Sequence, residues 1–536
     1  MIGAGMGGLT CAALLAHYGL SVAVVEAHSK AGGCAHTWSR RHEGREFDFD
    51  VGTSLFFGFH ERPSDNPIAA VIDLLGETVE AEPYAESKTA LFFPEGTFRT
   101  QIGSLDFADN VQQMWGRKAR LEWEALQGAC RALGEGATAI HPMAVRFDGS
   151  VMLTAGLRSP VGMFQSMRAM GRLGDRKFGD VVREHVSDPN VLTFVDTLCK
   201  ATSGIGTDDV VASYMVRTFN QLYSPGAKLE FPTGGGQGIV DAIVRGLRKR
   251  GGRMALGSRV ERVLSEGGRA TGVLLKGGRA IRATRAVVSG ATVWDTLSLV
   301  EGRQGRVRAG GEWTDSEDES EAEGEGEPGR GRVSDAYARQ VEEMGVHDSF
   351  MHLHAAVTAR DGEDLPLHSF FFDPEAVRGA SSWPTVCIPS AVDPTAAPDG
   401  YHVVHSYFAE PFSPWDAVSP RSEAYARMKA DREARLWGFA EQALPGARDR
   451  SVLALTGSPL THARFLNRHR GTYGPRNLQR YAGMPEANSP MPGLYVCGDS
   501  TWPGIGTPAA AASGMWVANT LVSVGKHWAA LDELRL

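Results

Sequence analysis

Residues 2–26 read IGAGMGGLTCAALLAHYGLSVAVVE, and this stretch decides the fold. The apolar Ile2 has the character of a strand end, and a glycine-rich turn follows it directly. The next residues place Leu9 and Ala13 on one face of a helix, which Gly19 ends. Residues 21–25 then form a β-branched run typical of a buried parallel strand. The order strand, glycine turn, helix and strand predicts the βαβ unit of a dinucleotide-binding fold.

The glycines of this turn each have a physical reason. Gly3 permits the tight turn, Gly5 lets a pyrophosphate approach the backbone, and Gly8 lets the helix pack against the strand. The N-terminus of the helix offers free N–H groups and partial positive charge to the phosphates. Glu26 ends the second strand about twenty residues further on, where a carboxylate accepts hydrogen bonds from the ribose hydroxyls. We therefore predict a dinucleotide site formed by Gly3, Gly5, Gly7, Gly8, Glu26 and Ala27.

The first strand is unusually short. Only Met1 and Ile2 precede Gly3, whereas a strand normally runs for about 5–6 residues. We expect the natural chain to begin further upstream, together with any targeting peptide, and extra apolar residues before Ile2 to improve cofactor retention.

The charge of the chain is concentrated in one segment. The net charge is −8, and residues 312–327 contain nine acids and no Lys or Arg. Without them the chain is nearly neutral, so no strong field favours nucleic acid. Residues 303–334 are rich in Gly, Glu, Arg and Ser and predict a disordered acidic loop, since they cannot bury enough apolar surface to offset the entropy of ordering.

The cysteines argue against a disulfide-rich or cysteine–metal protein, and the hydropathy argues against a membrane-spanning helix. The six cysteines are widely spaced with no CxxC pair, which indicates reduced thiols rather than a disulfide framework or a metal site. No stretch reaches the ~18 uninterrupted apolar residues of a membrane-spanning helix.

Two later segments carry the same glycine-rich texture as the start. Residues 231–238, FPTGGGQG, open a helix that Gly251 and Gly252 end, and short strands follow around 258–263, 272–276 and 286–289. Residues 493–501, GLYVCGDST, read as a buried strand that ends in Gly-Asp, and a helix begins near Pro508. Its N-terminus would face a bound cofactor, because the helix dipole favours negative charge there. The residues of this C-terminal segment that we predict to contact the cofactor are Gly498, Asp499, Gly506, Thr507, Pro508 and Ala509.

These motifs together resemble one family. The run GGLTCAALLAHYGLSVAVVEAHSKAGGCAH at 7–36, SPLTHARFLNRHRGTYGP at 458–475 and YVCGDSTWPGIGTPAAAASG at 495–514 resemble the carotenoid isomerase and retinol saturase branch of the phytoene desaturase-like FAD-dependent oxidoreductases. The resemblance implies that FAD is the cofactor, that Gly32 and Gly33 supply a second flavin-contacting loop, that Val260 meets the adenine, and that Asp499 bonds near the ribityl chain.

The resemblance also implies the architecture. We expect an α/β fold in which a Rossmann-like FAD-binding domain of amine-oxidase type is interleaved with an α+β substrate domain. The FAD-binding domain comprises 1–55, 227–300 and 485–536, and the substrate domain comprises 56–226 and 335–484.

The implied substrate is a lipophilic polyene, a carotenoid or retinoid. The expected reaction is cis-to-trans isomerisation of a carotenoid such as poly-cis lycopene through reduced flavin. The alternatives are a saturase or desaturase with net redox, and a non-catalytic prenyl-lipid binding protein like the Rab GDP-dissociation inhibitors. No acid–base pair stands out, because the flavin carries this chemistry; His462 is the one side chain that we name as a substrate-domain contact. A plastid location follows from the resemblance alone, and the oligomeric state stays open.

Two further patterns admit two interpretations each. Residues 151–178 interleave Met163, Phe164, Met167 and Met170 with basic residues, which predicts either a peripheral membrane contact or a helix packed on the core with a solvated basic face. His352 and His354 alternate on a predicted strand and share one face. They suit metal ligation, but the sequence shows no third ligand, so we expect structural histidines and no metal.

Overall fold

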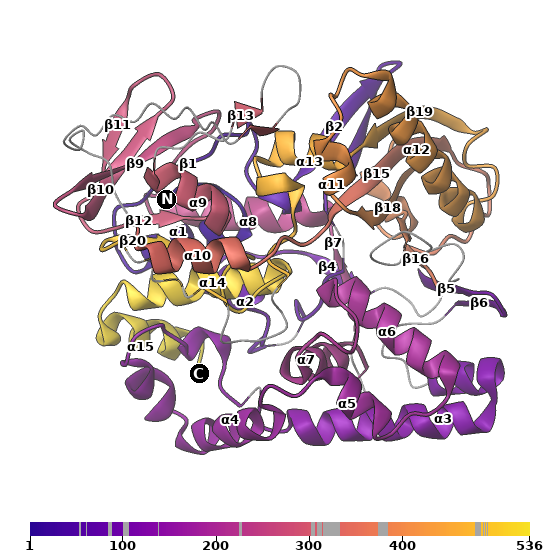
Figure 1. The fold of residues 1–536 in the computed structure, drawn as a ribbon, viewed down its shortest axis with the longest axis horizontal. Coiled ribbons are helices and arrows are strands. Elements are labelled where there is room, and N and C mark those ends of the chain that lie inside the picture. The colour runs from indigo at the N-terminus through magenta and orange to yellow at the C-terminus, as the bar shows by residue number, and fades with distance from the viewer. Residues whose placement is uncertain are drawn as a thin grey trace.

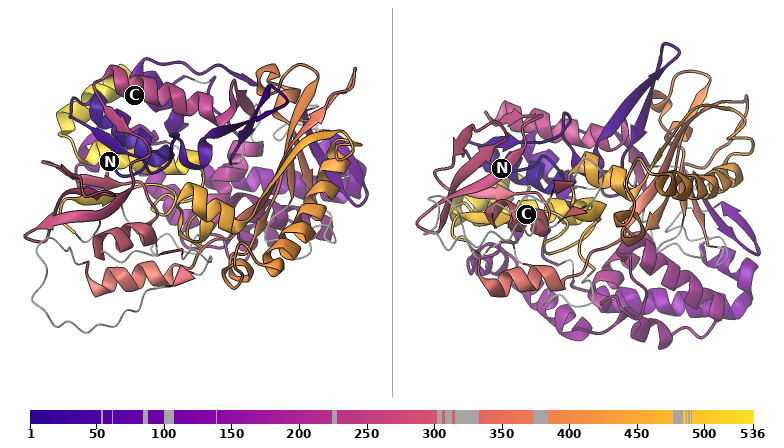
Figure 2. Two further views of the ribbon diagram at one scale, coloured as in Figure 1. Left: turned by 90° about the horizontal axis from the view of Figure 1, so that it is seen from above. Right: turned by 45° about the horizontal axis from the view of Figure 1, so that its top comes forward.

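The computed structural model describes residues 1–536 except 53–54, 61, 84–87, 100–106, 138, 224–227, 302–305, 308–312, 315–332, 373–383, 477–483, 486, 488 and 490. Strands and helices of the chain's two ends lie together on one side of the molecule, and a large sheet lies on the other (Figure 1). The two turned views in Figure 2 show the same separation, with both termini on the side away from the large sheet.

Segments far apart in the sequence form one parallel sheet around the start of the chain. β1 (Ala23–Val25) pairs with β8 (Arg253–Ala255), and β12 (Val287–Ser289) pairs with β20 (Leu494–Val496). Ile2 lies between the two pairs, with parallel bridges to Val25 and to Ser289. The predicted Rossmann-like α/β fold is confirmed. The limits of the two interleaved domains stay a prediction.

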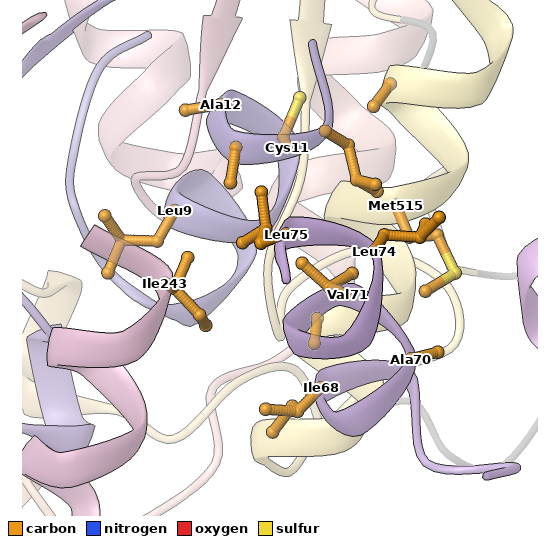
Figure 3. Close-up of a cluster of buried hydrophobic side chains, with 14 of the residues drawn as sticks. Leu9, Cys11, Ala12, Ile68, Ala70, Val71, Leu74, Leu75, Ile243 and Met515 are labelled. Atoms are coloured by element: carbon orange, nitrogen blue, oxygen red, sulfur yellow. The ribbon is translucent and has the colours of Figure 1, made fainter. Parts of the chain in front are cut away.

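α1 (Met6–His17) is the centre of this half of the molecule. Every residue from Met6 to Ala16 is buried, because α14 (Thr507–Thr520), α8 (Gly235–Lys249) and α2 (Pro67–Leu75) pack around it. Figure 3 shows side chains of all four helices in one buried cluster, with Leu9 of α1 near Ile243 of α8 and Leu75 of α2. The sequence predicted one apolar face for this helix, but all faces of α1 are buried. A helix that is apolar on all sides is typically buried on all sides.

A smaller antiparallel sheet and several helices flank the parallel sheet. The predicted strands of this region appear as β9 (Val260–Glu266), β10 (Arg269–Leu275) and β12, and β11 (Ala280–Arg282) pairs with β10. The helices are α9 (Val293–Glu301), α10 (Asp335–Glu343) and α15 (Val524–Glu533). The acidic loop expected at 303–334 lies outside the described residues, apart from β13 (Arg306–Val307), β14 (Trp313–Thr314) and its last two residues.

The other half is built on a seven-stranded sheet. Its order is β19 (Ser451–Gly457), β15 (Ser349–Thr358), β18 (Tyr401–Glu410), β17 (Thr385–Cys387), β16 (His368–Phe371), β5 (Thr89–Phe93) and β6 (Gly96–Arg99). α12 (Glu423–Ala443) covers the face that bears Leu353 and Phe408. The hairpin of β2 (Thr37–His42) and β3 (Arg45–Asp50) packs on the opposite face, next to α13 (Pro459–Leu466). The remaining short elements are α11 (Ser413–Asp416) and the pair of β4 (Ala81–Pro83) with β7 (Glu230–Pro232).

A helical layer lies below the large sheet in Figure 1. It contains α3 (Phe107–Gly134), α4 (Pro160–Leu173), α5 (Phe178–Arg183), α6 (Pro189–Ser203) and α7 (Ala212–Tyr223). Its core is aromatic, with Trp123 in ring contact with Phe107, Phe194 and Phe219. Within the described part of the chain, no helix has both the length and the apolar character to cross a membrane.

Candidate active site

One cavity of about 1460 Å³ joins the two halves of the molecule. The predicted cofactor residues that line it are Gly3, Gly5, Gly7, Glu26, Ala27, Gly32, Gly33, Val260, Gly498, Asp499, Gly506, Thr507, Pro508 and Ala509. Gly8 lies behind this surface: a Cβ there would stand 2.4 Å from the carbonyl oxygen of Gly3. The tertiary structure therefore brings together segments that are separated by up to about five hundred residues of sequence.

Two helix N-termini point at the cavity. α1 begins after Gly5 and α14 after Gly506, and neither glycine N-cap supplies a side-chain acceptor for the first N–H groups. A Cβ on Gly5 would meet nothing within 4 Å, so the backbone faces open space at the point where a pyrophosphate would approach. Free N–H groups and two helix dipoles therefore favour an anion here.

The glycine turn and the C-terminal segment touch through their backbones. A Cβ on Gly7 would lie 2.9 Å from the Ala510 carbonyl oxygen and 3.0 Å from the Cα of Gly498. Gly514 is closer still, because its Cβ would lie 2.0 Å from the carbonyl oxygen of Gly7. Only glycine permits these approaches, which hold α14 against the turn.

Glu26 is fixed by its own backbone surroundings. Its carboxylate accepts hydrogen bonds from the N–H of Ala4 at 2.6 Å and from the N–H of His28 at 2.7 Å. The backbone of Glu26 also accepts a bond from the N–H of Ser258, which brings the start of β9 and Val260 to the same end of the cavity.

Gly32 and Gly33 pack on the glycine turn at Gly3–Gly8. The N–H of Gly32 donates to the carbonyl of Ala4 at 2.7 Å, and a Cβ on Gly33, where φ is +57°, would lie 3.0 Å from the Cα of Gly5. His36 follows at the same wall, and burial lowers its pKa to about 4, so this imidazole is neutral at pH 7.

An ion pair that sequence reasoning missed supports the Gly-Asp segment. The Arg468 guanidinium donates to the Asp499 carboxylate at 2.6 Å and to the carbonyl of Thr472. Arg468 stands in the SPLTHARFLNRHRGTYGP motif, so it was visible in the sequence, but its partner lies 31 residues further on and the contact is tertiary. Nearby, burial raises the pKa of Asp295, whose carboxylate accepts the Thr292 hydroxyl and the N–H of His469.

Aromatic side chains line the cavity on the side of the large sheet. Phe350, Phe370 and Tyr407 reach it from three strands of that sheet. Leu222 of α7 and Leu229, which precedes β7, also line it, together with polar residues of α7 such as Arg217 and Gln221. These aromatic and aliphatic side chains suit the binding of a lipophilic ligand.

His462 is buried beside this wall and does not line the cavity. Its ring stacks on Tyr473, which does line it, with 5.1 Å between centroids. Its other neighbour is His352, at 5.4 Å.

Comparisons with known proteins agree with this geometry. Residues 1–71 match the family model described as an NAD(P)-binding Rossmann-like domain. The chain is 25% identical to the chloroplastic prolycopene isomerase of Arabidopsis thaliana, over 98% of this chain and 82% of that protein. It is 23% identical to the all-trans-retinol 13,14-reductase of Danio rerio, over 93% and 81%. It is 26% identical to the neurosporene-forming phytoene desaturase of Rhodobacter capsulatus, over 98% and 94%.

A solved structure extends the agreement to the architecture. Putrescine oxidase bound to putrescine superimposes with a TM-score of 0.57 over 96% of this chain and 97% of its own, at 16% identity. The likeness shows that the predicted amine-oxidase-like architecture is present.

The glycine turn, the acid that ends β1 and the interleaved sheets define a dinucleotide-dependent oxidoreductase fold. Over almost its whole length the chain is similar to proteins named prolycopene isomerase, all-trans-retinol 13,14-reductase and phytoene desaturase.

Proposed function

We propose that this protein binds FAD and isomerises a cis double bond of a carotenoid, such as poly-cis lycopene, to trans. The similarity to prolycopene isomerases over almost the whole chain supports this function. The observation that carries it is the continuous cavity that extends from the glycine turn to the aromatic side chains of the large sheet.

The residues present fit FAD. The N-termini of α1 and α14 would hold the pyrophosphate and the pyrimidine end of the flavin, because both end in uncapped N–H groups at the cavity. Glu26 and Val260 would hold the adenosine end, and Gly498, Asp499 and the Gly506–Ala509 backbone the flavin end. A cavity of about 1460 Å³ exceeds the roughly 300–1,000 Å³ that one small ligand fills, so it leaves room for a second molecule.

The chain's own part in the reaction is to position the polyene and exclude water. Reduced FAD, when bound, would supply electrons that lower the order of a conjugated double bond for a time, so that the bond can rotate, and that return to the flavin afterwards. Phe350, Phe370 and Tyr407 offer flat apolar walls along which a polyene can lie. Arg468 holds Asp499 in place, so the carboxylate faces the cavity in a fixed position.

A saturase or desaturase is the second candidate, because the retinol reductase and the phytoene desaturase match the chain over a similar span. These reactions leave a net change of two hydrogens in the product, and isomerisation leaves none. The mass of the product therefore separates the two candidates.

We also propose that residues 151–178 contact a membrane surface. Large apolar side chains are exposed along η4 (Met152–Gly156) and α4: Met152, Leu153, Leu157, Val161, Phe164, Met167 and Met170. Met163 alone of the predicted set packs inward, against the core. Arg168 and Arg172 are exposed beside this apolar face and would meet anionic headgroups. A plastid location is part of the proposal, since the Arabidopsis relative is named chloroplastic.

The test uses purified protein loaded with FAD and reduced with dithionite. Incubation with poly-cis lycopene under anaerobic conditions should give all-trans lycopene of unchanged mass by chromatography and mass spectrometry. A product heavier or lighter by two hydrogens would replace the isomerase assignment with a saturase or desaturase. Protein that takes up no FAD and still retains the polyene would overturn the enzyme assignment altogether.

A further inference from the structure

Three buried histidines meet on one face of the large sheet. His352 and His354 alternate along β15, so both side chains point to the same side. His405 lies on β18 directly opposite His354 and supplies the third ligand that the sequence did not reveal. Their exposed fractions are 5%, 7% and 4%. The strand pairing therefore gathers three imidazoles in a pocket closed to solvent.

The ring nitrogens lie at distances that suit a shared metal ion. One nitrogen from each histidine falls within 4.8 Å of the other two. Nδ1 of His352 and Nε2 of His405 are 2.8 Å apart. Nitrogens bound to one tetrahedral ion at about 2.0–2.1 Å stand about 3.4 Å from each other, so small side-chain movements bring the set to this spacing.

His354 already has the outer contact that a metal ligand needs. Its Nε2 lies 3.0 Å from the backbone carbonyl of Asp50, and a carbonyl only accepts, so Nε2 carries the proton. This tautomer leaves the lone pair on Nδ1. Metal-binding histidines donate their second N–H to a carbonyl or carboxylate in the same way.

His352 and His405 also have ring nitrogens that can bind a metal ion. Nε2 of His352 is buried without a hydrogen-bond partner. One of the two facing nitrogens, Nδ1 of His352 or Nε2 of His405, carries a proton that it donates to the other. The donating ring can change tautomer and carry that proton on its second nitrogen instead. Both facing nitrogens then have a free lone pair, and both imidazoles stay neutral. Burial holds the pKa of all three histidines below the usual value, which also favours the neutral form.

The three rings can be redirected by small rotations. The rings of His354 and His405 are stacked, with 4.3 Å between centroids, and turning about the soft Cβ–Cγ torsion directs their lone pairs to one point.

We propose that His352, His354 and His405 bind a divalent transition-metal ion of the kind that imidazole prefers, such as Zn²⁺. Three histidines leave the fourth position of a tetrahedral ion to a non-protein donor. The site lies beside the cavity wall that Phe350 and Tyr407 form on the same strands, and none of its three histidines lines the cavity. It is therefore separate from the cofactor residues and does not depend on the proposed reaction.

The test measures metal binding directly. Purified full-length protein is stripped with a chelator and titrated with Co²⁺, which gives visible absorption bands when its environment is tetrahedral. We expect saturation at one Co²⁺ per chain, displacement by Zn²⁺, and a rise in the melting temperature with added Zn²⁺, because a ligand that binds only the folded state stabilises it.

Variants show which residues bind. His405→Gln should weaken Co²⁺ binding by more than the roughly 10–100-fold that loss of an outer contact costs. His402→Gln is the matched control, because it changes a histidine of the same strand that faces the other way and bonds Ser390. If His405→Gln does not fold, His354→Gln replaces it in the titration. No tetrahedral Co²⁺ spectrum with the unaltered protein, or equal binding by a folded ligand variant, would overturn the proposal.

Discussion

Gly514→Ala tests the close approach of α14 to the glycine turn. The added Cβ would stand 2.0 Å from the carbonyl oxygen of Gly7, so the two backbones must separate by about 1 Å or more to reach an ordinary contact. Overpacking of this kind costs about 1–3 kcal/mol, and the contact with rigid backbone places it at the upper end. Alanine returns about 0.5–1 kcal/mol through its better helix propensity. The expected net loss of stability is about 2 kcal/mol.

The consequence for function is specific. Separating α14 from the glycine turn changes the spacing between the two N-termini that face the cavity, so FAD retention should fall together with stability. Gly438→Ala is the control, since this glycine lies inside α12 and a Cβ there meets nothing within 4 Å. It should raise stability by about 0.5–1 kcal/mol.

Both variants are compared by thermal melting and by flavin content after gel filtration. A Gly514→Ala protein that melts with the unaltered protein and keeps its full flavin would refute the argument from backbone contact.

Three further predictions follow from other parts of the structure. Glu26→Gln leaves a single oxygen to accept from Ala4, His28 and the ribose hydroxyls. Losing one hydrogen bond to a charged acceptor costs about 1.5 kcal/mol, so FAD should bind roughly tenfold more weakly by fluorescence titration, while the exposed Glu46→Gln binds normally. Phe164→Ser combined with Met167→Ser should abolish sedimentation with anionic vesicles, and Leu121→Ser, which alters an apolar residue exposed on α3, should leave it unchanged. Burial lowers the pKa of His527 to about 4, so the unfolded chain takes up the proton first and stability falls as the pH drops from about 6.5 to 4. His527→Gln should reduce that fall by up to about 3 kcal/mol in denaturant titrations at pH 4.5 and 7, and an unaltered slope would contradict it.

Local sequence patterns were sufficient for the cofactor half of the fold. The glycine turn, the β-branched strand and the acid at its end are set by short-range backbone geometry, which is why residues 2–26 predicted α1 and β1 correctly. The strands β9, β10 and β12 and the start of α14 also lie where glycines and prolines placed them. Each of these signals depends on residues within one element or one turn.

Contacts between distant segments were not visible in the same way. Arg468 is paired with Asp499, and Gly7 with Gly514, by the way the sheets and helices pack. The sequence singled out Gly7 and Asp499 but did not reveal their partners. The Met-rich stretch of 151–178 showed the composition of α4, but only packing decides that Met163 points inward and Phe164 outward.

The histidines make the division clearest. The sequence by itself determined that His352 and His354 share a face, because side chains alternate along any strand. Only the tertiary structure decided that His405 joins them, since strand register depends on long-range pairing of β15 with β18. In the same way the sequence determined a dinucleotide-binding turn at Gly3–Gly8, and the fold decided what closes around it: the N-terminus of α14, the Gly32–Gly33 loop and the aromatic wall of the large sheet. Short-range backbone chemistry can be read along the chain, whereas the shape of a cavity is a property of surfaces that meet only after folding.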